Sequence, residues 1–388
     1  MPNLYRYSLG WKDDQAYHPE LYRAFLAPVL SCIKDNLRSL SLNVPPELLH
    51  TLPSVYLPRL ESLSVDLCTK EKSEEEIDRI FDSFVVFVNN LLGSLESLSI
   101  SSRVPSRSLR LDRFFRMLGT FPHMRRFSLS IPFDGIHLRS SDELVKFLNK
   151  HRYTLNHLRL SASRCSPLDS PADPESKFWI RNTFTHLNTP YPYLRDLHLA
   201  IRPIRVDLTP LMKFLELHTL ESLTLTERAL TYSEVKAILD ALRAYEHSNE
   251  LKQLRLKLKH LTPALFELLA TRIPRLALLE LIFDDIVATA VHTRSSASAS
   301  DPAHPIEDEF VGMSFNQTTL HPDCIVQRLF VDEIKKNRVL YASWGLVTLK
   351  LFQESSDRRV KDLFEVFADC IPAIQNYVDL TTESFNYA

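Results

Sequence analysis

Nearly the same six residues occur three times in this chain, as LESLSV at 60–65, LESLSI at 95–100 and LESLTL at 220–225. With conservative replacements, the pattern L-x-x-L-x-L starts at Leu37, Leu60, Leu95, Met124, Leu155, Leu194, Leu220, Leu251 and Leu276, with a weaker copy at Leu346 and another in LYRYSL from Leu4. The spacings from Leu37 to Leu276 run from 23 to 39 residues and average about 30. This period predicts one elongated array of repeats in place of several globular domains.

Each copy of the pattern predicts a short strand. Side chains alternate between the two faces of a strand, so Leu98 and Ile100 should point inward while Ser97 and Ser99 point outward. One strand cannot hide its apolar stripe alone, so the units must stack into a parallel sheet, and each must return through a crossover that is usually a helix. Segments with apolar residues at helical spacing are found at 19–36, 73–93, 111–121, 140–151, 232–249 and 262–274. We therefore expect an α/β solenoid with parallel strands on the concave side and helices on the convex side.

Composition narrows the function classes. Hydrophobic content of 45% and charged content of 24% are ordinary for a globular protein, so a real core is expected. The formal net charge of -2 indicates no long-range attraction to nucleic acid or to an anionic membrane, and we expect neither as a partner. The start of the chain is not typical of a signal peptide, and the apolar runs are too short to span a bilayer. The expected location is intracellular, cytoplasmic or nuclear.

No catalytic or metal-binding motif is present. The glycines are too far apart for a phosphate-binding loop, and neither H-E-x-x-H nor G-x-S-x-G occurs. The cysteines are scattered with no C-x-x-C pair, which favours buried reduced thiols over a disulfide framework or a zinc site; they are Cys32, Cys68, Cys165, Cys324 and Cys370. We therefore predict that the protein is not an enzyme and that it has no catalytic residues, cofactor or metal site.

The repeat pattern is interrupted once. Residues 286–312 are rich in Ser, Ala and Pro and lack periodicity, which is typical of a flexible insertion. A phosphorylation-controlled switch in RSSASAS is the alternative interpretation. The predicted organisation is a solenoid over 1–285, the insertion over 286–312, and terminal repeats with a C-terminal cap over 313–388. Within the last part we expect a helix at 321–337, a strand at 344–352 and a helix at 356–374.

The repeats resemble those of leucine-rich-repeat proteins of the ribonuclease-inhibitor-like type over residues 30–285. Strands such as LRSLSL at 37–42 and LESLSV are most similar to the repeats behind the F-box in fungal F-box-like proteins. The family pattern continues to an Asn or Cys at its ninth position, and only Cys68 fits here. The ladder that this residue normally forms should therefore be mostly absent, so stability should come chiefly from leucine burial, at about 1.5 to 3 kcal/mol for each fully buried side chain.

The resemblance implies a substrate-recognition subunit of a ubiquitin ligase, which would need an F-box to bind a Skp-type adaptor. The segment VPPELLHTL at 44–52 is similar to the opening of an F-box. Only seven residues separate Leu52 from the next repeat at Leu60, which favours a short connecting turn and helix instead. The chain also begins inside a repeat, although terminal repeats normally carry a polar cap. We therefore expect an upstream segment, with an F-box as the first candidate.

The outward positions of the strands define the candidate binding residues. The early repeats present serines, whereas adjacent later repeats present a polar cluster. The candidate protein-binding residues are Arg126, His157, Arg159, Asp196 and His198, with a second basic group formed by Arg255 and Lys257. Arginine forks match carboxylate and phosphate oxygens, so the expected ligand is an acidic or phosphorylated protein segment. A solvated face without a ligand is the alternative, and the lack of aromatic residues in these columns leaves loops or outer helices as rival surfaces.

Two function classes follow. The first is substrate recognition in an F-box-type ubiquitin ligase, and the second is a free-standing leucine-rich-repeat scaffold or adaptor. A catalytic solenoid would be a further class, but no motif favours it. Recovery of adaptor and cullin with the native protein would select the first class, and other stoichiometric partners would select the second.

Overall fold

The computed structural model describes most of the chain as two compact units. The described residues are 4–10, 19–44, 49, 52–67, 74–102, 110–133, 137–163, 178–187, 189–201, 208–217, 220–243, 251–288, 322–354 and 361–379. The first unit comprises residues 1–228 with 240–248, and the second comprises 229–239 with 249–388.

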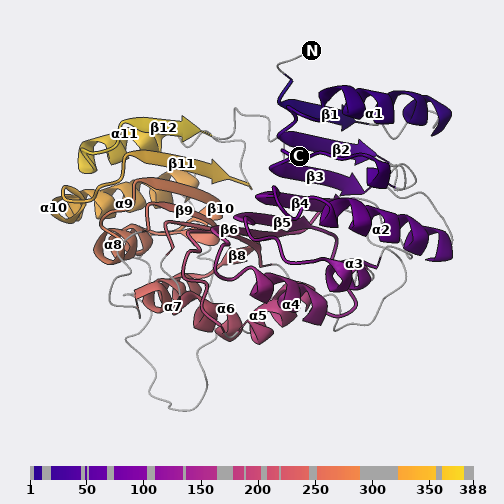
Figure 1. Cartoon of the computed structure of the whole chain (residues 1–388). Coiled ribbons are helices and arrows are strands. Elements are labelled where there is room, and N and C mark those ends of the chain that lie inside the picture. The colour runs from indigo at the N-terminus through magenta and orange to yellow at the C-terminus, as the bar shows by residue number, and fades with distance from the viewer. Residues whose placement is uncertain are drawn as a thin grey trace. The chain divides into compact units, whose positions relative to one another are not determined.

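The first unit contains strands that all pair in parallel, each with the next in chain order (Figure 1). The strands are β1 (Arg6–Gly10), β2 (Ser39–Val44), β3 (Ser62–Leu67), β4 (Ser97–Ser102), β5 (Arg126–Ser130), β6 (His157–Ser161), β7 (Asp196–Ala200) and β8 (Ser222–Leu230). The helices between them are α1 (Pro19–Ile33), α2 (Glu74–Asn89), α3 (Leu111–Met117), α4 (Asp142–Lys150), α5 (Trp179–His186) and α6 (Thr209–Leu215). These helices lie along one face of the sheet (Figure 1).

The second unit repeats the same arrangement. Its strands are β9 (Gln253–Leu261), β10 (Leu278–Ile286), β11 (Thr348–Gln353) and β12 (Asn376–Asp379), and they also pair in parallel and in chain order. Its helices are α8 (Pro263–Arg272), α9 (Pro322–Lys336), α10 (Arg338–Tyr341) and α11 (Lys361–Cys370). Strand β8 and helix α7 (Tyr232–Arg243) contribute residues to both units.

The predicted repeats are confirmed strand by strand. Strands β1 to β11 each begin two residues after the first residue of a predicted copy of the pattern, as β4 at Ser97 does after Leu95. Equivalent positions are also in register, so Leu63 pairs with Leu98, and Leu98 with Phe127. The fold is therefore an α/β leucine-rich-repeat solenoid with irregular repeats of about 30 residues.

The core lies between the sheet and the helices. The inward residues Leu98 and Ile100 are 0% and 1% exposed, whereas Ser97 and Ser99 on the other face are half-buried. Under the middle of the first unit the leucines give way to aromatic rings. The ring of Phe127 on β5 lies 5.9 Å from that of Phe115 and 5.2 Å from that of Phe147. Helices α3 and α4 are thereby fixed against β5.

Some elements were not predicted. Helices α5 and α6 have only eight and seven residues, too short for the helical spacing of apolar residues to stand out. Strand β12 has four residues, and Asp379 occupies the place of its last apolar residue, which hides the pattern. The predicted helices 73–93 and 356–374 end earlier in the structure, at Asn89 and Cys370, because the residues that follow form turns that lead into β4 and β12.

Several sequence features fall largely outside the described residues. Most of VPPELLHTL is among them, and so is the predicted insertion 286–312 apart from residues 286–288. Within the described part of the chain, no helix has the length and apolar character needed to cross a membrane.

Candidate protein-interaction face

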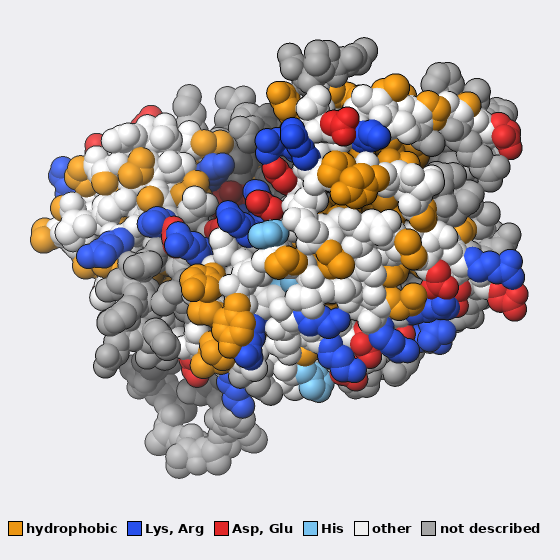
Figure 2. Space-filling model, in the orientation of Figure 1, with side chains coloured by type: hydrophobic (Ala, Val, Ile, Leu, Met, Phe, Trp, Pro, Cys, Tyr) orange, Lys and Arg blue, Asp and Glu red, His pale blue; other side chains and the backbone are white. Residues whose placement is uncertain are grey.

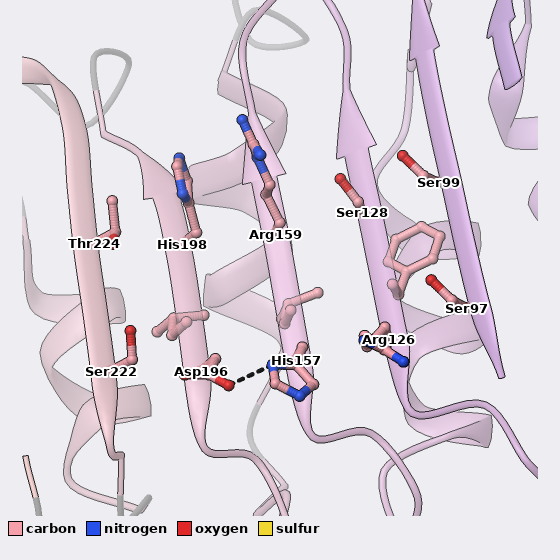
Figure 3. A pocket seen from close by; sticks show the side chains of 13 residues that line it. Ser97, Ser99, Arg126, Ser128, His157, Arg159, Asp196, His198, Ser222 and Thr224 are labelled. Atoms are coloured by element: carbon pink, nitrogen blue, oxygen red, sulfur yellow. Dashed lines mark ion pairs between the residues drawn. The ribbon is translucent and has the colours of Figure 1, made fainter. Parts of the chain in front are cut away.

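Three neighbouring strands of the first unit bring the predicted cluster together. Arg126, His157 and Asp196 are in register as the first residues of β5, β6 and β7. Two residues further along, Arg159 and His198 are in register on β6 and β7. Adjacent strands lie ~4.8 Å apart, so these side chains form a compact group on the face opposite the helices (Figure 3).

The charges in this cluster are only partly neutralised. His157 Nδ1 forms an ion pair with Asp196 Oδ2, marked by the dashed line in Figure 3. Arg126 lies on the other side of His157, is exposed, and forms no ion pair with any residue that the structure describes. Arg159 is exposed as well, and its side chain extends along its strand in the same direction as that of His198 (Figure 3). The cluster therefore carries net positive charge.

Small hydroxyl side chains border the cluster and leave space above it. The open hollow here has a volume of about 490 Å³. Its floor includes Ser97, Ser99 and Ser128 on one side, and Ser222 and Thr224 on the other. Serine and threonine hydroxyls can donate and accept hydrogen bonds, so the floor offers polar contacts around the arginines. The hollow suits a small acidic group lying on the sheet better than a large apolar ligand.

The His157–Asp196 pair also resembles part of a catalytic triad, which would need a hydroxyl or thiol nucleophile hydrogen-bonded to the histidine. Among the described residues no serine forms a hydrogen bond with His157, and its neighbour on β5 is the cation Arg126. No group of His, Cys, Asp and Glu among these residues has the arrangement of a metal site either.

A buried histidine, His151, lies in the turn that leads into β6. The ring of His151 lies 4.6 Å from that of Phe147, and its Nε2 accepts a hydrogen bond of 2.9 Å from the backbone N–H of Phe121. Nδ1 is therefore the protonated nitrogen, and it donates to the carbonyl of Phe147 at 2.8 Å. Burial lowers the pKa of His151 and so favours the neutral ring. The hydrogen bond to the Phe147 carbonyl opposes this shift in part. This neutral ring holds the turn that leads into β6.

The second predicted basic group has a different environment. In the second unit, Arg255 Nε lies 2.9 Å from Glu280 Oε1 on the next strand. Lys257 Nζ donates to both carboxylate oxygens of Glu354, at 2.6 and 2.8 Å. The structure thus places Arg255 and Lys257 on the same strand, as the sequence indicates, and gives each an acidic partner.

Two tyrosines that were not predicted as site residues lie just before two strands of the cluster. Tyr153 and Tyr193 are 61% and 57% exposed, in the turns that lead into β6 and β7. The prediction considered only alternating strand positions, and turn residues do not follow that alternation. The signal was present in RYTL at 152–155 and PYLR at 192–195, where a tyrosine precedes the first leucine of each repeat.

Comparison with known proteins does not assign the chain to a family. No protein-family model matches the sequence, and no curated protein is significantly similar to it.

Proposed function

We propose that the chain is a non-catalytic protein-interaction module whose strand face binds an acidic or phosphorylated segment of a partner protein. The observation that carries this proposal is Arg126. This member of the cluster is exposed and has no ion pair among the described residues. A guanidinium presents several N–H donors in a planar fork that fits carboxylate or phosphate oxygens. The serine floor leaves room for such a group to approach.

The proposed context is substrate recognition in an F-box-type ubiquitin ligase inside the cell. Its support is the likeness of the repeat strands to those behind the F-box of fungal F-box-like proteins. A Skp-type adaptor would then bind an F-box upstream of the repeats, and the strand face would select the substrate. The alternative is a free-standing leucine-rich-repeat scaffold, which would use the same face without an adaptor.

The test is affinity purification of the full-length native protein followed by mass spectrometry, with Arg126→Ala/Arg159→Ala in parallel. We expect the double variant to lose specific partners that the wild type retains. Arg59→Ala/Arg139→Ala is the matched control, because both arginines are exposed in the first unit and lie outside the cluster. Equal partner recovery by wild type and Arg126→Ala/Arg159→Ala would overturn the proposed site. Adaptor and cullin among the partners would select the ligase context.

A further inference from the structure

The turns that carry Tyr153 and Tyr193 lie next to each other at the edge where the cluster begins. Tyr153 precedes His157 by four residues, and Tyr193 precedes Asp196 by three. His157 and Asp196 are paired across β6 and β7, so the two turns belong to neighbouring repeats at the same sheet edge. With its side-chain amide turned so that the nitrogen faces these turns, Asn156 donates to the carbonyls of Thr154 at 3.0 Å and Tyr193 at 3.3 Å.

Both turns are held by hydrogen bonds to buried or partly buried groups. His151 fixes the first turn, because its carbonyl accepts from the backbone N–H of Leu155 at 3.0 Å while its ring is bonded on both nitrogens. In the second turn, the hydroxyls of Thr189 and Tyr191 both donate to Asn149 Oδ1, at 2.9 and 3.1 Å. A fixed turn saves the cost of ordering the backbone on binding, so Tyr153 and Tyr193 are presented on a preorganised backbone.

The surroundings of the two rings are strongly basic. Residues 122–126, 152–159 and 192–198, which form the turns and the strand starts, contain the arginines Arg125, Arg126, Arg152, Arg159 and Arg195, and Asp196 as their one acidic residue. Arg152 lies over the ring of Tyr153 at 4.4 Å from its centroid. Arg195 pairs with Glu221 at 3.0 Å. Tyrosine and arginine together are the residues that most often dominate protein interfaces.

The visible surface gives no sign of a large apolar interface. Figure 2 shows separate hydrophobic patches between charged and neutral side chains on the face in view. A partner that depends on one continuous apolar area would not fit such a surface. A short peptide that combines an acidic group with a single ring-bearing side chain would fit the cluster and the two tyrosines.

We propose that Tyr153 and Tyr193 form an aromatic subsite that selects acidic peptides carrying an aromatic side chain close to the acidic residue. This proposal rests on the proposed function, because the acidic residue would bind at the cluster. Tyr153 precedes His157 by four residues, a span of at most about 13 Å, so a peptide anchored at His157 would reach Tyr153 within about four positions. Edge-to-face or offset contacts between aromatic rings would add to the affinity.

The experiment uses the full chain and libraries of short degenerate peptides with a fixed central phosphoserine, glutamate or unmodified serine. We expect the wild type to enrich aromatic residues near an acidic centre and to bind an enriched peptide at least tenfold more tightly than the same peptide with alanine at the aromatic position. Tyr153→Ser/Tyr193→Ser should lose the aromatic enrichment and keep the preference for an acidic centre. Comparison of the phosphoserine and glutamate libraries distinguishes a phosphorylated ligand from one whose negative charge comes from a carboxylate.

The matched control is Tyr5→Ser/Tyr56→Ser, which removes two equally exposed tyrosines that precede β1 and β3. It should retain both preferences. Acidic selection without aromatic enrichment, or enrichment that survives Tyr153→Ser/Tyr193→Ser, would overturn the aromatic subsite while leaving the proposed function intact. No preference for either acidic centre over serine would overturn both proposals. Unchanged thermal unfolding of the variants would show that loss of binding does not come from misfolding.

Discussion

Charged side chains on β5 to β7 and on β9 to β11 occupy equivalent strand positions, yet they are placed for different tasks. Arg126 in the first unit is exposed and has no ion pair among the described residues. In the second unit, the side chains of Arg255 and its partner Glu280 are only 23% and 13% exposed. Lys257 is occupied by Glu354 in the same way. Under the proposed function the first group receives an acidic ligand, whereas the second already holds its own counter-charges.

The difference arises from which residues stand in register. One row across β9, β10 and β11 reads Arg255, Glu280 and Lys350, so charges of opposite sign alternate. The equivalent row across β6 and β7 reads Arg159 and His198, with no carboxylate. Opposite charges on adjacent strands stabilise a sheet and leave little net field. A basic residue on a solenoid strand is therefore informative about ligands only together with its neighbours on both adjacent strands.

The prediction with the largest expected effect on stability compares the two units by unfolding one of them. Leu98 is fully buried, so Leu98→Asp places a charge in the core and should destabilise the first unit by more than about 4 kcal/mol. Repeats are stabilised mainly by their nearest neighbours, so amides of β3 to β5 should lose protection from hydrogen exchange while those of β9 to β11 keep theirs.

The matched control for this variant is Ser99→Asp, one position along the same strand and on the opposite face. Its stability should change by no more than about 0.5 kcal/mol. Loss of protection in both units of Leu98→Asp would show that they unfold together. Unchanged unfolding of that variant would contradict the inward orientation of Leu98.

Most of the fold could be predicted because burial imposes a regular pattern on the sequence. The inward apolar positions of LESLSI recur from β1 to β11, filled mostly by leucine, and the strands begin where that pattern places them. Short elements escaped prediction, because α6 has only about two turns over which a pattern could repeat. Strand β12 escaped because Asp379 replaces an apolar residue.

The candidate site was predictable only in part. Alternation along the strands is enough to place Arg126, His157 and Asp196 side by side. The pairing of Arg255 with Glu280 could have been inferred from the same columns. The pairing of Lys257 with Glu354 could not, because these residues are 97 positions apart and Glu354 follows the end of β11.

A second test removes the counter-charge from the second unit. Glu280→Gln should destabilise the protein by about 1 to 3 kcal/mol, because the partly buried guanidinium of Arg255 loses its carboxylate. Glu221→Gln is the control in the first unit, since its partner Arg195 is 64% exposed and should tolerate the change at a cost of less than about 1 kcal/mol. Chemical denaturation measures both. Equal effects of the two variants would contradict the contrast between an internally paired group and an exposed one.

A third test concerns the buried histidine His151, in the turn that leads into β6. Burial lowers the pKa of His151 in the folded protein. The unfolded chain therefore binds more protons at this residue than the folded protein does once the pH falls below about 6.5. Stability from this residue is therefore fully present above that pH and is lost on acidification, with a slope of at most about 1.4 kcal/mol per pH unit. Chemical denaturation at several pH values measures this dependence. On acidification, the free energy of unfolding should fall less steeply for His151→Gln than for the wild type.

The second unit provides the comparison for the pH test. The pKa of His260 is also lowered, mainly by burial and then by Lys259, while Asp285 and Asp284 oppose the shift. His260→Gln should therefore also reduce the fall in the free energy of unfolding on acidification, and the double variant should show a smaller fall than either single one. If His151→Gln leaves the slope of the wild type unchanged, its ring is not held in the neutral form.

The smallest expected effect is that of the ion pair between Lys257 and Glu354. Both groups are partly exposed, so a double-mutant cycle with Lys257→Met and Glu354→Gln should give a coupling energy of about 0.3 to 1 kcal/mol, smaller at high salt.

The carboxyl of Asp284 reports the same pair independently. Its pKa is raised by burial first and then by the Glu354 carboxylate, against an opposing effect of Lys257. Glu354→Gln removes the repulsion and frees the ammonium, so the pKa of Asp284 should fall when followed by carboxyl NMR. A coupling energy of zero with an unchanged Asp284 titration would mean that Lys257 is as available to a ligand as Arg126.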